Sequence, residues 1–460
     1  MLVAPDAAEG FLMRSKLAVA LVVGALIAGF AGMSPAQGAS SSDISERRLG
    51  ARSPYIVVLN DDVEPRGLAK RLDVTPEHVY TAAFAGFSSL LTDRQVDMLL
   101  RNRAVSAVIP DVATFEIDDR DLDSFGVMAR TSNATGQDAC VFLVCQHIPL
   151  NMQRVDAIRS RTADIDWRDD ARVDADIAII DSGVRDHPDI NLVGSSYCAP
   201  GRPAGVPDEH GTEAAGVAAM IDDTNGLVGS APGARIWSVQ VTNTADGAIT
   251  MRSVLCAVDW VVANSDVIEV ANMSLGTHEP EIGNCGLTAK GRIADPLHHA
   301  ICRAVDLGVT FTVSAGNDSM DAANQIPAAY DEVITVSGYV DYDGEPGGKF
   351  AESRCYGVEF GDEEDDTFAY WSNYGADVDI TAPGDCVLTS FGTDEARFRV
   401  VSGTSFSAPA VAGAAALLYA KDPSITPEEV RAGLIANGEQ VFMPDDPDGI
   451  NEPLLNLKGL

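Results

Sequence analysis

Basic side chains are scarce in this chain. Lysine and arginine together number 32 against 68 aspartates and glutamates, which gives a formal net charge of −36, and lysine itself is nearly absent. Because an acidic surface repels polyanions and the sequence contains no basic patch, we exclude nucleic acid as a partner. Salt screens the self-repulsion of such a surface. The composition therefore fits a salt-adapted source and an ordinary acidic secreted protein equally well.

Several patterns that would indicate other classes of protein are also missing. The chain has no C-x-x-C pair, no phosphate-binding loop, no internal repeat and no coiled-coil heptads. These absences argue against a cysteine-based zinc site, a nucleotide site and a repeat architecture. The apolar run at residues 17–30 is too short for a comfortable membrane span, so we expect no stable membrane anchor.

The first 39 residues have the features of a secretory signal peptide. Arg14 and Lys16 precede the apolar run, and small residues follow it as far as Ala39. We expect residues 1–39 to be removed and the protein to be secreted to the extracellular space; a retained N-terminal anchor is the alternative. In an exported protein, eight cysteines indicate disulfides rather than thiols or metal ligands.

Residues 50–120 are predicted to form a small α+β domain. Residues 55–61 are typical of a strand, 91–103 of a helix and 104–117 of two further strands. The next stretch, 121–146, is polar, rich in aspartate and irregular. We interpret it as a junction that contains a processing site.

Residues 147–460 are predicted to form a doubly wound α/β domain. Strand and helix patterns alternate along it, as a mainly parallel sheet with helices on both faces requires. The expected strands are 231–241, 267–275, 309–315, 333–338 and 378–382, and the expected helices are 248–264 and 297–308. The predicted fold class is therefore α/β, preceded by the smaller α+β domain.

Three residues could carry hydrolytic chemistry in this domain. Asp181 ends a buried apolar run, at the sheet edge where open α/β folds carry their sites. His210 and Ser405 each begin an alanine-rich stretch, and Pro409 is expected in the first turn of the helix that contains Ser405. A serine is a useful nucleophile only beside a base and beside donors for the oxyanion. The G-x-S-x-G elbow of α/β-hydrolases fails here, because Ser407 stands where its second glycine would be.

Five short blocks follow one another in a characteristic order. They are D-S-G at Asp181, H-G-T at His210, N-M-S-L-G at 272–276, S-A-G-N at 314–317 and G-T-S-F-S-A-P at 403–409. These blocks resemble those of the subtilisin-like serine peptidases, and among them the secreted branch that includes proteinase K. The resemblance implies a monomeric serine endopeptidase that cleaves proteins and peptides without a cofactor for catalysis.

The resemblance also assigns roles to individual residues. Ser405 would attack the peptide carbonyl, His210 would act as the general base and Asp181 would orient His210. Asn317 and the backbone N–H of Ser405 would form the oxyanion hole. Residues 274–276 would be an open strand edge that pairs with the substrate backbone. The substrate-binding residues implied are Ser274, Leu275, Gly276, Ser314, Ala315 and Gly316.

By the same resemblance, residues 50–120 are an inhibitory propeptide whose C-terminal segment lies in the cleft as a slowly released product. An unrelated small domain is the alternative. The family generally holds structural calcium, so we expect calcium here without assigned ligands. The acidic run 362–366 is either a solvated loop or a calcium site, since clustered carboxylate oxygens suit this cation.

Cysteine pairing does not follow from spacing alone. Resemblance to cysteine-rich family members, together with proximity in sequence, favours Cys140–Cys145, Cys285–Cys302 and Cys355–Cys386. Cys198 and Cys256 would then form a fourth pair or remain as buried thiols.

Two departures from the family pattern leave alternatives open. Glu213 stands where a second histidine is common; it either interacts favourably with the helix dipole or raises the pKa of His210. Gln325 and Ile326 are bulkier than an open first specificity pocket requires. A catalytically silent binding or scaffold protein and a narrow processing protease are therefore competing hypotheses, although a complete set of Asp181, His210, Ser405 and Asn317 argues against the silent form.

Overall fold

The structure is a computed structural model, and the residues it describes all belong to one compact unit, Leu49–Leu460. The described residues are 51–117, 146–199, 208–243, 247–348, 354–356, 358–359, 363–393, 398–441, 443 and 445–460. The predicted signal peptide, almost all of the predicted junction and the predicted Cys140–Cys145 pair lie outside them.

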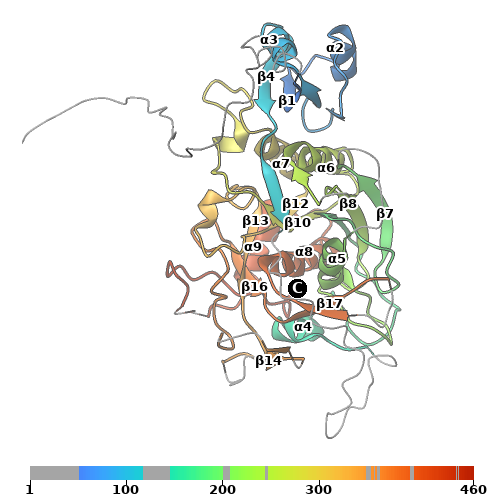
Figure 1. Cartoon of the computed structure of the whole chain (residues 1–460). Coiled ribbons are helices and arrows are strands. Elements are labelled where there is room, and N and C mark those ends of the chain that lie inside the picture. The colour runs from blue at the N-terminus through green and yellow to red at the C-terminus, as the bar shows by residue number, and fades with distance from the viewer. Residues whose placement is uncertain are drawn as a thin grey trace, which may run out of the picture. The chain divides into compact units, whose positions relative to one another are not determined.

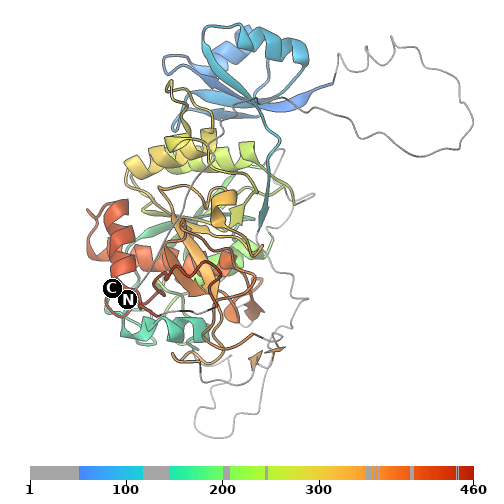
Figure 2. The ribbon, with the colours of Figure 1, turned by 90° about the vertical axis from the view of Figure 1, so that its left-hand side faces the viewer.

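The first domain contains an antiparallel four-stranded sheet in the order β2-β3-β1-β4 (Figure 2). Its elements are β1 Ser53–Leu59, α2 Pro65–Arg71, β2 His78–Tyr80, β3 Gly86–Leu91, α3 Asp93–Leu100 and β4 Val105–Pro110. Helix α3 begins later than expected, because Leu91 ends β3 and Thr92 forms a capping box with Gln95. Side chains such as Val57, Phe87 and Leu99 form a core of their own between the sheet and the helices.

A seven-stranded sheet organises the second domain, with the order β16-β13-β12-β10-β6-β8-β7 and parallel pairing throughout. The strands are β6 Asp176–Asp181, β7 Leu192–Tyr197, β8 Arg235–Gln240, β10 Val270–Met273, β12 Thr310–Ser314, β13 Ile334–Tyr339 and β16 Ile380–Pro383. The predicted parallel α/β class is therefore confirmed.

Helices cover both faces of this sheet. Figure 1 shows α5 (His210–Ala219) and α8 (Thr404–Lys421) on one side, and α6 (Met251–Ala263) and α7 (Pro296–Asp306) on the other. Successive side chains of a strand point to opposite faces. Accordingly, Ile177 and Ile179 of β6 pack in the cluster with α5 and α8, whereas Ala178 and Ile180 pack with α6 and α7. The apolar run of β6 is continuous because both of its faces are buried.

Shorter elements complete the two domains. They are β5 Thr114–Ile117, α4 Leu150–Arg154, β9 Ile249–Thr250, β11 Leu275–Gly276, β14 Arg354–Cys355, β15 Val358–Glu359, β17 Val387–Ser390, β18 Phe398–Val401, α9 Pro427–Asn437 and the 3-10 turns Ala157–Arg159, Asn284–Gly286 and Ala322–Asn324. Strands β11, β5 and β9 form a small separate sheet. Within the described part of the chain, no helix is both long and apolar enough to cross a membrane.

Three expected boundaries were wrong for local reasons. The strand expected over 267–275 is divided into β10 and β11. Ser274 lies between them, and its hydroxyl donates to the Ser405 carbonyl of helix α8. The helix expected from 248 begins at Met251, because Thr250 caps α6 and its backbone belongs to β9. Strand β8 starts at Arg235, because Gly233 with a φ of +67° makes a turn before it.

Candidate active site

The predicted aspartate lies at the carboxyl end of the seven-stranded sheet. Asp181 is the last residue of β6, between β10 and β8, and its side chain is fully buried. A buried carboxylate requires hydrogen-bond donors, and the Ser182 N–H donates to Asp181 Oδ1 at 2.5 Å. Gly183 follows in a left-handed conformation, with a φ of +99°. The D-S-G block is therefore a turn that holds the carboxylate at the sheet edge.

The predicted histidine begins helix α5 and faces this carboxylate. His210 Nδ1 lies 2.8 Å from Asp181 Oδ1, and both side chains are buried. The next residue must be small, because a Cβ at Gly211 would lie 2.5 Å from the carbonyl oxygen of Gly183. The Gly211 N–H also donates to Ser182 Oγ at 3.0 Å. The D-S-G and H-G-T blocks are therefore in direct backbone contact, which only a glycine at position 211 permits.

The predicted serine is the second residue of helix α8. Gly403 precedes the helix with a φ of +143°, and the Ser405 side chain is buried. The ring of Phe406 packs against the imidazole of His210, with ring centroids 5.2 Å apart. Because Phe406 directly follows Ser405, this contact brings the first turn of α8 beside His210.

Pro409 is the sixth residue of α8, so our placement of it in the first turn was wrong. Proline has no N–H and leaves the carbonyl four residues earlier, that of Ser405, without a helical donor. The structure supplies one from outside the helix: Ser274 Oγ donates to the Ser405 carbonyl at 2.7 Å. Asn272 Nδ2 in turn donates to Ser274 Oγ at 3.0 Å. The N-M-S-L-G block therefore supports the start of α8 as well as forming a strand edge.

The amide of Asn317 is fixed against the same helix start. Its Oδ1 accepts from the Thr404 N–H at 3.0 Å and from Thr404 Oγ1 at 2.9 Å. Thr404 Oγ1 also accepts from the Gly316 N–H at 3.1 Å. With Oδ1 engaged by two donors, the Asn317 Nδ2 group is directed away from Thr404. The side chain is thus fixed against Thr404, the residue that precedes Ser405.

The predicted substrate edge at 274–276 carries a strand from the first domain. Strand β5 pairs antiparallel with β11, with Leu275 opposite Ile117 and Gly276 opposite Glu116. On its other side, β5 pairs with β9. Phe115, in the middle of β5, is buried. An extended segment of this chain therefore occupies the strand edge, in the manner of β-augmentation.

The second predicted edge, Ser314 to Gly316, is bonded within the domain. Asn373 Nδ2 donates to the Ala315 carbonyl at 2.8 Å, and the Asn373 N–H donates to the Gly316 carbonyl at 2.9 Å. Gly316 has a φ of +106°, and a Cβ there would collide with the Asn373 and Gln325 amides. A Cβ at Gly276 would collide with Gln325 as well. The buried Gln325 side chain therefore lies between the two predicted edges.

Sequence analysis missed three residues that hold this arrangement: Asn272, Asn373 and Thr404. Thr404 lies inside the G-T-S-F-S-A-P block, so its role could have been inferred from its position beside Ser405. Asn373 carries no such signal, because its contacts with 315–316 join segments distant in sequence.

Comparison with known proteins gives the family. A model of the subtilase family matches residues 174–450, a stretch that contains Asp181, His210, Asn317 and Ser405. The chain belongs to the subtilase family.

Related proteases cover most of this subtilase. It is 25% identical to the alkaline protease of Alkalihalobacillus alcalophilus over 394 residues, which is 85% of this chain and 88% of that protein. It is 31% identical to subtilisin DY of Bacillus licheniformis over 260 residues, 55% of this chain and 80% of that protein. A cold adapted subtilisin-like serine proteinase of known structure is 24% identical, with a TM-score of 0.47 over 63% of this chain and 92% of the other. Family membership and the two related proteases identify a serine endopeptidase.

Glu213, which stands where the family pattern has a second histidine, forms an ion pair with Arg399. It lies one turn after His210 in α5, and its buried carboxylate accepts from Arg399 Nη1 of β18 at 3.2 Å. Because Arg399 balances this charge, the pair favours a structural role for Glu213 over an effect on the pKa of His210.

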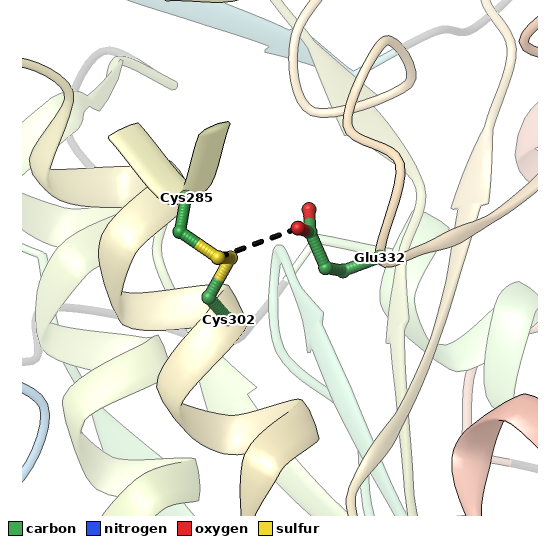
Figure 3. A group of neighbouring side chains, drawn as sticks. All are labelled: Cys285, Cys302 and Glu332. Carbon is green, nitrogen blue, oxygen red and sulfur yellow. Dashed lines mark hydrogen bonds between the residues drawn. A yellow bond between two sulfur atoms is a disulfide. The ribbon is translucent and has the colours of Figure 1, made fainter. Parts of the chain in front are cut away.

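Three disulfides are present among the described residues: two were predicted, and the third joins Cys198 and Cys256, for which buried thiols were the alternative. They are Cys198–Cys256, Cys285–Cys302 and Cys355–Cys386. Figure 3 shows the second of these beside Glu332, whose Oε1 lies 3.3 Å from Cys285 Sγ. A disulfide offers no thiolate, so this group is not a metal site. Glu332 instead accepts from His298 Nε2 at 2.7 Å.

Two groups of carboxylates within the described residues could hold a cation. In each, one oxygen from every residue lies within 4.8 Å of the others; the groups are Asp341, Asp343 and Asp365, and Asp446, Asp448 and Glu452. The first group includes part of the acidic run 362–366, of which Asp362 lies outside the described residues. Asp366 is not available to it, because this carboxylate pairs with Arg154 Nε at 2.9 Å.

Proposed function

We propose that this subtilase is a secreted endopeptidase that hydrolyses peptide bonds of proteins through Asp181, His210 and Ser405, and that it is made as a self-processing proenzyme. The observation that carries the proposal is the 2.8 Å approach of His210 Nδ1 to Asp181 Oδ1, with the imidazole packed against Phe406 beside Ser405. This geometry supports a general base whose Nδ1–H is directed to Asp181 and whose ring packs against the residue after Ser405.

The geometry supports the following roles. With Nδ1–H donating to Asp181, His210 Nε2 is the basic nitrogen that takes the Ser405 proton as Oγ attacks the carbonyl, and it returns that proton to the leaving amine. Asp181 stabilises the imidazolium that forms and is itself shielded from water by burial. Departure of the amine leaves an acyl-enzyme at Ser405 Oγ. His210 Nε2 then takes a proton from a water molecule as its oxygen attacks the acyl carbonyl, and returns that proton to Ser405 Oγ as the acid product leaves.

The oxyanion of the tetrahedral intermediate would receive two donors. One is the backbone N–H of Ser405, which belongs to the first turn of α8 and has no intrahelical acceptor. The other is Asn317 Nδ2, oriented by the two bonds from Thr404 to Oδ1. Donors that are fixed before the charge develops require no reorganisation during the reaction.

We propose the following division of the chain: signal peptide 1–39, inhibitory propeptide 50–120, junction with the processing site 121–146 and catalytic domain 147–460. The pairing of β5 with β11 supports it, because residues 114–117 take the place that a substrate strand would take. The connection from β5 continues directly into the junction. A cleavage product would then remain bound as an intramolecular inhibitor.

One observation favours a restricted side-chain preference. The buried Gln325 lies between Gly276 and Gly316 and is bonded to Asn373, whose Nδ2 donates to Gln325 Oε1 at 3.0 Å. A side chain inserted between the two strand edges would have to displace it. A peptide-library digest should therefore show a narrower preference at the residue before the cleaved bond than a Gln325→Gly variant shows.

Maturation tests the proposal. Ser405→Ala should be secreted at precursor length less the signal peptide, whereas the parent chain should yield the mature species. N-terminal sequencing of both products gives the cleaved bonds. Mature protein obtained from pure Ser405→Ala would refute self-processing, and a Ser405→Ala protein that retains peptidase activity would refute the role of the serine.

A further inference from the structure

A second charged centre lies in the C-terminal segment that follows helix α9. Asp446, Asp448 and Glu452 each direct one carboxylate oxygen to within 4.8 Å of the other two. None of the hydrogen bonds or ion pairs of the described residues links them to Asp181, His210 or Ser405. The group is therefore independent of the proposed peptidase site.

Two of these carboxylates are removed from water. Glu452 is 7% exposed and Asp446 is 9% exposed. Glu452 Oε1 is fully buried and has no hydrogen-bond partner among the described residues. Burial of an acceptor without a donor is unfavourable, and burial of a negative charge without a partner is more so. This oxygen therefore points to a ligand that the polypeptide does not itself provide.

Among the residues that the structure describes, no cationic side chain forms an ion pair with this group. The ion pairs in the described part of the chain use other carboxylates, such as Asp366 with Arg154 and Asp379 with Arg431. Burial, followed by repulsion from its neighbours, raises the pKa of Glu452 to about 8, and burial raises the pKa of Asp446 to about 6. Within the described residues, the group therefore lacks the partner of opposite charge that buried carboxylates require.

We propose that Asp446, Asp448 and Glu452 bind a hard divalent cation, with Ca²⁺ as the best fit. Three carboxylates and no nitrogen or sulfur donor form the set of ligands that hard cations prefer. Asp448 is exposed at the end of the group, so the ion can enter from solvent and retain water ligands. The bound ion would offset the charge of the group and supply the partner that Glu452 Oε1 lacks.

The position of the site gives the ion a structural consequence. Leu454 lies two positions after Glu452. Its backbone forms one isolated β-bridge with Thr381 of β16 and another with Glu439, which follows α9. Leu454 is buried beside Tyr339, Phe368 and Met443. A cation that joins both ends of the 446–452 loop would therefore hold the C-terminal segment against the edge strand of the main sheet.

Calcium titration tests the site in the full chain carrying Ser405→Ala, which avoids autolysis. After removal of metal with a chelator, calorimetry counts bound Ca²⁺ for this parent, for added Glu452→Gln and for added Asp448→Asn. Asp445→Asn is the matched control, because it removes an exposed neighbouring charge that lies outside the group. We expect the first two variants to bind one Ca²⁺ fewer per chain than the control; any other calcium site cancels in this difference.

The exposed position of Asp448 guards against a folding artefact, since Asp448→Asn leaves the core unchanged. Calcium should also raise the unfolding midpoint of the parent and of Asp445→Asn by more than that of Glu452→Gln. The proposal is overturned if Glu452→Gln and Asp448→Asn bind as many Ca²⁺ ions as Asp445→Asn. It is also overturned if Glu452→Gln is more stable than the parent without calcium, and if calcium raises its unfolding midpoint as much as that of Asp445→Asn. The group would then be stabilised by losing a charge and would need no cation.

Discussion

Asp259 on helix α6 should be a principal anchor of the proposed propeptide. Its Oδ1 accepts from the backbone N–H groups of Ala83 at 2.8 Å and Ala82 at 2.9 Å, and both of its oxygens lie 3.2 Å from the Thr81 nitrogen. These donors belong to the turn between β2 and β3. Asp259→Ala removes the acceptor for all three and disturbs no contact that we assign to catalysis.

The expected loss of binding free energy in Asp259→Ala follows from the number of hydrogen bonds that Asp259 accepts. A hydrogen bond to a charged group contributes about 1.5–3 kcal/mol net, and two of the three bonds here have good geometry. Because the turn is only partly buried, water satisfies some of the released N–H groups, so we take about 3 kcal/mol for the whole anchor. That value corresponds to a roughly hundredfold weaker complex. Asp259→Asn keeps one acceptor oxygen and should therefore lose less binding free energy than Asp259→Ala.

The assay is inhibition of the mature enzyme by the 49–117 segment added in trans. Asp259→Ala should raise the inhibition constant roughly a hundredfold, at about 1.4 kcal/mol per tenfold, and leave kcat/KM for a small peptide unchanged. Asp266→Ala is the control, since this exposed aspartate just beyond α6 accepts no bond from the first domain within the described residues. Equal inhibition constants for Asp259→Ala and Asp266→Ala would show that the contact between the two domains does not carry the inhibition.

Four further predictions concern Asn317, the disulfides, bound cations and the pH dependence of stability. Asn317→Ala should lower kcat by about 10²–10³-fold, or ~3–4 kcal/mol, with little change in KM; a change confined to KM would contradict the oxyanion role. Reductant should lower the unfolding midpoint, at about 2–4 kcal/mol per disulfide, and mass mapping that found all cysteines free would refute the pairing. EDTA should lower thermal stability even in molar sodium chloride, because a ligand bound only by the folded state acts independently of screening. An effect that vanishes at high salt would leave the acidic run 362–366 as a solvated loop and would count against a cation bound by Asp446, Asp448 and Glu452. In the chelated protein, the pKa of Glu452 is raised by burial from 4.5 to about 8, so its contribution to stability is complete below pH 4.5 and disappears as the pH rises through 8. Calcium should flatten that decline between pH 5 and 8 in a series of melting curves, and an unchanged slope would count against the cation site.

Features encoded in short stretches could be predicted from sequence. The position of Asp181 at the end of β6 follows from an apolar run, and the position of Ser405 in the first turn of α8 follows from a small-residue turn before an alanine-rich stretch. The parallel sheet could also be predicted from short stretches, because buried strands such as β6 are apolar on both faces. Strand β7 was missed because it contains glycine and serines in place of an apolar pattern.

Interactions between distant segments could not be predicted. Pro409 was expected to be harmless in the first turn of α8, whereas it leaves the Ser405 carbonyl to be satisfied by Ser274, which lies 131 residues earlier. Asp259 has no sequence pattern that distinguishes it from any other carboxylate on a helix, and its three bonds appear only when the first domain is in place. Glu452 is similar, because its burial depends on how the C-terminal segment packs.

Covalent labelling of the mature protein tests the role of Ser405 most directly. A phosphonofluoridate reagent reacts with a serine that a neighbouring histidine activates, and peptide mass mapping locates the adduct. We predict one labelled peptide, containing Ser405, with loss of peptidase activity in proportion to labelling, and no labelling of His210→Ala. An enzyme that digests protein while Ser405 stays unlabelled, or that is inactivated by an adduct elsewhere, would contradict the proposed Asp181, His210 and Ser405 mechanism.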